Sequence, residues 1–164
     1  MSWATIRSAL VTRLAAVTGI ENVHGQIRYL NDSVDDTRFS NLFLDDNEGL
    51  HTWQFTRTNR VEVSCPDDST KATVTHSVRL LGLLMLSDAG TGSTNSEDTF
   101  QALVDTLAEE FRDGFSDSAR TLGGACITYS VPTFTVRHAS YFNHYLAHEA
   151  EATFDVEELV TVGA

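Results

Sequence analysis

Residues 141–158 read YFNHYLAHEAEATFDVEE, and the periodicity of this stretch decides how the C-terminal end of the chain folds. From residue 149 onward, apolar residues occupy the even positions, namely Ala150, Ala152, Phe154 and Val156. The odd positions hold the polar residues, namely Glu149, Glu151, Thr153, Asp155 and Glu157. A strict period of two is typical of a strand with one buried face. The stretch therefore predicts a strand over 141–160 with an apolar face and an acidic face.

The same stretch contains two histidines that could suggest a metal site. His144 and His148 would lie one turn apart on a helix, a spacing that can hold zinc. On a strand they lie about 13 Å apart, at roughly 3.3 Å per residue, and cannot share one ion within a chain. The segment HYLAH also lacks the second-position Glu of the metalloprotease motif. We expect no metal and no cofactor, and keep a small metal-dependent hydrolase using His144, His148 and Glu149 as a less favoured alternative.

Two longer strands precede this one and are joined by a short turn. Residues 51–65 alternate, and residues 71–87 alternate at first and are then apolar throughout. With a turn at 66–69 between them, they predict a β-hairpin. The odd-numbered apolar residues expected to share one face of the first strand are Trp53, Phe55, Val61 and Val63. Shorter strands are expected over 22–30 and over 125–138, the latter bent at Pro132.

Two helices are expected beside these strands. Residues 3–17 follow Ser2 as N-cap and stop at Gly19, and residues 95–113 follow a capping-box pair, Thr94 and Glu97. The apolar stripe of the first helix is Trp3, Ile6, Leu10, Leu14 and Val17. The order α-β-β-β-α-β-β predicts one α+β domain over 1–164. We expect a mostly antiparallel sheet of four to five strands with both helices on one face.

Charge and composition exclude several functional classes. The net charge is −12, and Lys71 is the only lysine among 11 basic residues. An acidic chain repels phosphate backbones, so tight DNA binding on the outer surface is not expected. Acid excess with so little lysine suggests a salt-loving host. The chain contains no apolar run long enough for a membrane span, and Cys65 and Cys126 are too few for a disulfide framework or a zinc site.

Three other motifs do not match the sequence patterns of known chemical sites. Residues 88–96, DAGTGSTNS, lack the lysine of a phosphate-binding loop, and Glu97 and Asp98 would repel a nucleotide there. Residues 45–49, DDNEG, miss the glycine and glutamate spacing of a calcium loop, so a solvated turn is favoured and a loose calcium or sodium site is the alternative. No G-x-S-x-G elbow is present. A Ser/His/Asp triad formed by residues distant in sequence remains an alternative.

Residues 31–49 predict a long loop holding Phe39, Leu42 and Phe43, and loops this long are often functional.

Two segments together resemble the tail terminator (tail completion) proteins of long-tailed phages and archaeal tailed viruses. Residues 6–29 resemble the family's opening helix, Gly-Ile turn, Val-His pair and Arg-containing strand, here Gly19-Ile20, Val23-His24 and Arg28. Residues 144–159 resemble its closing strand, where acidic and apolar residues alternate. The pattern of strands and helices between them is also similar.

The resemblance implies a structural virion protein without an active site. Such proteins form a ring, usually of six subunits, that caps the head-proximal end of the tail tube and stops its polymerisation. The implied partners are further copies of the chain, the tail tube protein and the connector or stopper proteins of the neck, with viral DNA passing through without specific binding. The implied location is the tail or neck of the virion, assembled in the host cytoplasm and not on a membrane.

Within this resemblance two groups of residues acquire provisional roles. The acidic strand face of Glu149, Glu151, Asp155 and Glu157 is a candidate lining of the channel, because like charges let DNA slide without sticking. The segment with Phe39, Leu42 and Phe43 is a candidate contact with a neighbouring subunit or the tube. Another head–tail connector or stopper protein is the nearest alternative, and a host interaction module unrelated to viruses is a further one.

Overall fold

The computed structural model describes residues 2–28, 36–46, 48–87, 95–117, 119–142 and 145–162. In chain order the elements are α1 (Trp3–Ala15), β1 (Val23–His24), α2 (Asp36–Phe43), β2 (His51–Cys65), β3 (Asp68–Met85), α3 (Ser96–Arg112), β4 (Thr128–Tyr129), β5 (Thr133–Phe142) and β6 (Tyr145–Thr161). Among the described helices none is long and apolar enough to cross a membrane.

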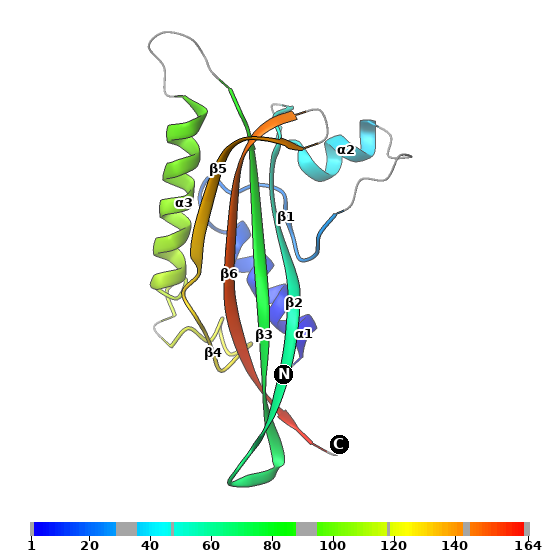
Figure 1. Ribbon diagram of the computed structural model, residues 1–164, viewed down its shortest axis with the longest axis vertical. Coiled ribbons are helices and arrows are strands. Elements are labelled where there is room, and N and C mark those ends of the chain that lie inside the picture. The colour runs from blue at the N-terminus through cyan, green and yellow to red at the C-terminus, as the bar shows by residue number, and fades with distance from the viewer. Residues whose placement is uncertain are drawn as a thin grey trace.

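The strands form one sheet, in which three long antiparallel strands make the centre (Figure 1). The strand order is β1-β2-β3-β6-β4, and β5 pairs with β6 on the same side as β4. This confirms an α+β chain with a mostly antiparallel sheet. Within the described residues it differs from the prediction in having six strands, a third helix and a first strand that runs parallel to β2.

Helices α1 and α3 cover the same face of the sheet, and the main core lies between them and the strands. Ser2 caps α1 as predicted, and Gly19 takes the left-handed φ of 82° that ends the turn after it. Strand residues of the core alternate along each strand, so the even residues of β6 point to the helices. The central members of this core are Ile6, Leu10, Leu14, Trp53, Phe55, Leu80, Phe100, Leu107, Phe111 and Phe154.

A β-bulge in β2 overturns the expectation that its odd-numbered apolar residues share one face. Arg57 pairs with Val78 and Asn59 with Ser77, so Thr58 is an extra residue. Beyond the bulge the parity of β2 is reversed, because one inserted residue moves every later side chain to the other face. Val61 and Val63 therefore lie on the face away from Trp53 and Phe55, and are 48% and 61% exposed.

The segment predicted as a loop over 31–49 contains α2. Its side chains Phe39 and Phe43 are buried in a second, smaller core on the sheet face opposite to α1 and α3. Phe39 stacks on Tyr145 with ring centroids 5.4 Å apart, and Leu42 is half-buried beside this core. The two phenylalanines are thus engaged within the chain rather than displayed for a neighbour. Residues 29–35 and Asn47 of this region lie outside the described residues.

Two boundaries differ in detail from those predicted. The cap of α3 is Asn95, whose side chain accepts a hydrogen bond from the Asp98 N–H at 2.8 Å; Thr94 lies outside the described residues. The strand expected over 125–138 is broken at 130–132 into β4 and β5, as the bend at Pro132 suggested. The far ends of β2 and β3 extend beyond α1 and α3 as a projecting arm (Figure 1).

Candidate assembly surfaces

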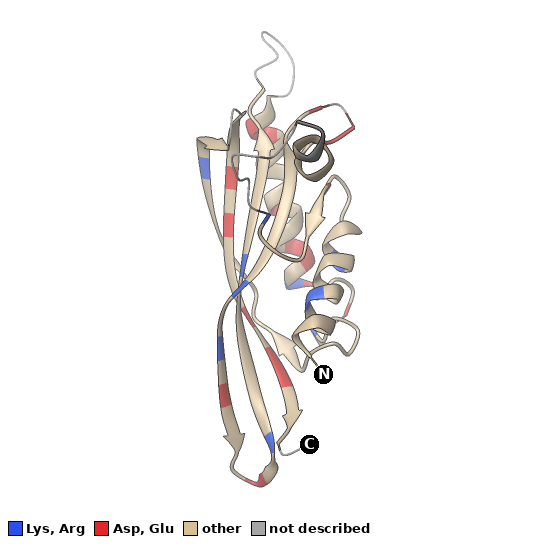
Figure 2. Cartoon of the chain, turned by 90° about the vertical axis from the view of Figure 1, so that its right-hand side faces the viewer, with Lys and Arg blue, Asp and Glu red and all other residues tan. Residues whose placement is uncertain are grey.

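The acidic residues of β6 lie together on the face that α1 and α3 leave uncovered. Ala150, Ala152, Phe154 and Val156 are buried toward the helices, so Glu149, Glu151, Asp155 and Glu157 point the opposite way. Figure 2 shows acidic bands on the strands of this side, away from α1. The period-two prediction for 149–157 is thereby confirmed. We call these four residues the acidic ladder.

Arginines on the neighbouring strands neutralise half of the acidic ladder. Arg79 on β3 donates to Glu151 at 2.8 Å, and Arg137 on β5 donates to Glu149 at 3.3 Å. Both pairs are partly exposed, and such pairs contribute roughly 0–1 kcal/mol each. The unpaired negative charge is therefore concentrated at Asp155 and Glu157. Sequence periodicity could not place the two arginines, because it gives the face of a residue but not the strand register.

The outer edge of β2 is the second notable surface. Among the described residues, β1 pairs with β2 only at Trp53 and Gln54. Along Thr56–Cys65 no described strand pairs with this edge, so its backbone N–H and C=O groups can accept another strand. Val61 and Val63 add exposed apolar surface to the same arm. An unpaired edge beside exposed valines is typical of an assembly surface.

A chain of polar side chains joins α3 to the last two strands. Ser96 Oγ lies 2.9 Å from His148 Nε2, and the Nδ1 atoms of His148 and His138 lie 2.9 Å apart. His138 Nε2 lies 3.6 Å from Glu97. One assignment satisfies both hydrogen bonds: Ser96 Oγ–H donates to His148 Nε2 and His148 Nδ1–H donates to His138 Nδ1, which leaves His138 Nε2–H facing Glu97. This group was not predicted, because Ser96, His138 and His148 come from separate elements.

This group also bears on the hydrolase alternative. His148 is buried on the helix side of the sheet, whereas Glu149 belongs to the acidic ladder on the other side. The two side chains therefore cannot bind one metal ion, and His144 lies outside the described residues. Cys126 is a free, buried thiol whose pKa is raised to about 11, mainly by burial, so it is a poor source of a nucleophilic thiolate.

Acidification is expected to destabilise the fold through His148. Burial lowers the pKa of His148, the like charge of His138 lowers it further, and Glu97 opposes this. The unfolded state then binds a proton at His148 more tightly than the folded state does. The stability that depends on a neutral His148 is therefore complete above about pH 6.5, the ordinary pKa of histidine. It is lost as the pH falls from there through the lowered pKa of the folded state. Burial also lowers the pKa of His51, which acts in the same direction.

Urea unfolding between pH 7.5 and pH 5 measures this effect. We expect the free energy of unfolding to fall with pH in the wild type, and to fall less steeply in His148→Gln. Glu62→Gln, on the exposed far end of β2, serves as the control and should keep the wild-type slope. Equal slopes in His148→Gln and the wild type would contradict a role for His148.

Three possible metal ligands meet where β2 begins. Ligand atoms of Glu21, Asp45 and His51 lie within 4.8 Å of one another. Asn22 holds the segments together by donating to the carbonyls of Leu44 at 2.7 Å and His51 at 3.0 Å. Burial, then Asp45 and Asp46, raises the pKa of Glu21.

One hydrogen bond argues against a metal ion in this cluster. Trp53 Nε1–H donates to His51 Nε2 at 3.2 Å, so Nε2 carries a lone pair and the neutral ring has its proton on Nδ1. A metal on Nδ1 would move that proton to Nε2 and break the bond to Trp53. The hydrogen bond from Trp53 therefore disfavours His51 as a ligand of a metal ion in this cluster.

Comparison with known proteins adds no family to these observations. No protein-family model matches the chain, and no curated protein matches it. Function must be inferred from the surfaces themselves, which are an unpaired strand edge on a projecting arm, an acidic ladder and a helix layer on one side of the sheet.

Proposed function

We propose that this chain is a structural protein that closes with copies of itself into a ring, in the manner of tail terminator proteins. In this proposal the ring caps the head-proximal end of a viral tail tube, stops its polymerisation and joins it to the neck, with DNA passing through the centre. The observation that carries the proposal is the unpaired β2 edge on a projecting arm with exposed Val61 and Val63. Six copies is the number implied by the family resemblance.

The two edges of the sheet favour a ring over a two-fold dimer. One edge is β2 beyond Gln54, and the other is β5, whose outer side is unpaired among the described strands. When two different edges of one sheet meet between copies, the contact is heterologous, and heterologous contacts generate closed rings if the rotation closes. A self-complementary dimer would use one edge and leave the other unpaired.

The acidic ladder supports a channel role for one face of the sheet. Asp155 is exposed and Glu157 is half-buried, and among the described ion pairs neither takes part. Carboxylates directed into a central channel would repel the DNA phosphates and prevent sticking. Arg79 and Arg137 limit the repulsion between the carboxylates themselves. A connector or stopper protein of the same neck is the second candidate, since an unpaired edge and an acidic face suit it equally.

Native mass spectrometry and negative-stain imaging of the purified chain test the proposal. We expect closed rings that cap tail tubes, and rings favoured by high salt because the net charge of −12 opposes association. A compact monomer in both low and high salt, indifferent to tubes, would overturn it.

A double variant, Val61→Lys with Val63→Lys, is expected to abolish the rings and leave the monomer folded. Both side chains are exposed, so the fold tolerates the lysines, while a strand docking against this edge would have to bury them. Thr153→Lys, exposed on the same sheet face but away from the arm, is the matched control and should still form rings. Rings of unchanged stability in the double variant would show that the arm is not the contact.

A further inference from the structure

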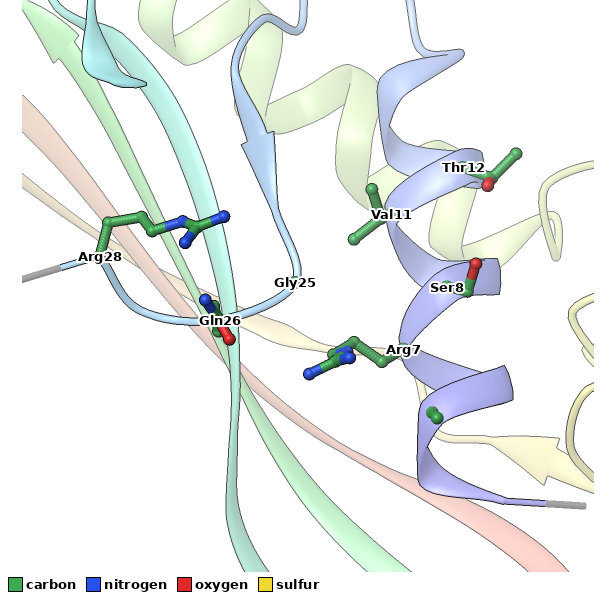
Figure 3. A pocket seen from close by; sticks show the side chains of 8 residues that line it. Arg7, Ser8, Val11, Thr12, Gly25, Gln26 and Arg28 are labelled. Carbon is green, nitrogen blue, oxygen red and sulfur yellow. The ribbon is translucent and has the colours of Figure 1, made fainter. Parts of the chain in front are cut away.

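A pocket of about 350 Å³ lies between α1 and the segment that follows β1. Arg7 on α1 and Arg28 on the segment line it together with Ser8, Thr12, Gly25 and Gln26. Figure 3 shows the two guanidinium groups directed into the same space from opposite sides, with Gln26 between them. Among the described residues that line it, none is acidic.

The two arginines are unusual in a chain with this charge. Among the ion pairs of the described residues none involves Arg7 or Arg28, although the chain has an excess of 12 negative charges. The Nε atom of Arg28 is buried and has no hydrogen-bond partner within the described part of the chain. A buried donor without a partner costs roughly 1–3 kcal/mol, more for a charged group. Both observations indicate that an anion completes this pocket.

The segment that carries Arg28 is held in place independently of any ligand. The Arg28 backbone N–H donates to Gln54 Oε1 at 2.7 Å, and Gln54 is buried in β2. Gly25 lies so close to α1 that a Cβ there would meet Arg7 Cγ at 2.9 Å. The arginines are thus positioned before an anion arrives. Each guanidinium group can bind one carboxylate through two parallel hydrogen bonds.

The same chain displays the complementary charge on the opposite flank of the sheet. The outer stripe of α3 exposes Asp98, Asp105 and Glu109, and in the described ion pairs none of the three takes part. Asp105 and Glu109 are one helical turn apart, where like charges destabilise a helix. α3 lies beyond β5, whereas the pocket lies on the side of β1 (Figure 1).

We infer that the Arg7–Arg28 pocket receives Asp105 and Glu109 from α3 of a second copy of this chain. The inference rests on the proposed ring and names the contact that closes it. The pocket and the stripe lie on different flanks, so each copy offers one of each, and the contact is heterologous. Each contact pairs two arginines with two carboxylates, and none of the four has an ion partner among the described residues of its own chain.

Charge reversal tests this contact. Arg7→Glu with Arg28→Glu, and separately Asp105→Arg with Glu109→Arg, should each remain folded by circular dichroism and lose the ring in native mass spectrometry. An equimolar mixture of the two variants should recover rings that alternate between them, because each reversed pocket then meets a reversed stripe. Thr99→Arg, exposed on α3 but turned about 100° around the helix axis from Asp98, is the control that keeps the ring.

The outcomes separate this inference from the proposed function. Wild-type rings together with intact rings in both reversed variants would overturn the contact and leave the ring proposal standing. Wild-type monomers in every salt condition would overturn both. Calorimetric titration with inorganic phosphate adds a further test. If the wild type binds phosphate, and Arg7→Glu with Arg28→Glu abolishes this binding but leaves the rings intact, the pocket is a site for a small anion and the contact is overturned. Rings that are absent in each reversed variant alone and return in the mixture of the two would establish the contact between the pocket and α3.

Discussion

Gly82→Ala is expected to lower the free energy of unfolding by about 1–3 kcal/mol, although alanine differs from glycine by one methyl group. Gly82 lies opposite Trp53 in the β2–β3 register. A Cβ at this position would lie 2.2 Å from Trp53 Cζ3 and 2.4 Å from Cε3. The indole is fully buried and stacks on Phe100 with ring centroids 6.2 Å apart, so it has no space to move.

Urea unfolding at neutral pH measures this effect, and a double-mutant cycle assigns its cause. If the loss comes from the indole, Trp53→Leu should make Gly82→Ala nearly neutral, since the smaller side chain leaves room for the methyl group. Thr153→Ala, exposed on the neighbouring strand, is the control and should change stability by less than about 0.5 kcal/mol. A cost for Gly82→Ala that persists in the Trp53→Leu background would refute the steric explanation.

The hairpin and the faces of β6 could be predicted from the sequence because both depend on local periodicity. Strand β2 spans His51–Cys65 as predicted, and β3 begins three residues before the predicted 71. The bulge at Thr58 could not be predicted, since 51–65 keeps its alternation through the inserted residue. The bulge alone decides that Val61 and Val63 point away from the core. The regular alternation over 51–65 therefore did not predict that Val61 and Val63 are exposed on the arm.

Helix α2 and the polar groups depend on contacts between distant segments. Phe39 and Phe43 have helical spacing, but the polar residues around them are equally typical of a loop, and burial against Leu83 and Ala147 stabilises the helix. The pocket of Arg7 and Arg28 likewise requires α1 to lie beside the segment after β1. Sequence gives the chemistry of each side chain there, whereas tertiary packing brings them together.

Glu158 breaks the apolar face of β6 that the alternation predicts, and His76 accounts for it. His76 Nε2–H donates to Glu158 Oε1 at 2.9 Å, and the two side chains are 1% and 5% exposed. The Trp3 ring covers His76 at a centroid distance of 5.2 Å, and the Arg57 guanidinium lies 5.3 Å above Trp3. His76 Nδ1 and Glu158 Oε2 have no hydrogen-bond partner among the described residues.

His76→Leu is expected to lower the free energy of unfolding by about 3–5 kcal/mol, because it leaves a buried carboxylate without its donor. Adding Glu158→Leu should recover most of that loss, since two apolar side chains can replace a buried polar pair with little cost. Urea unfolding of the single and double variants at neutral pH measures both steps. Glu151→Ala removes a partly exposed pair with Arg79 and should cost no more than about 1 kcal/mol. If the double variant is as unstable as His76→Leu alone, the packing of His76 under Trp3 matters more than its bond to Glu158.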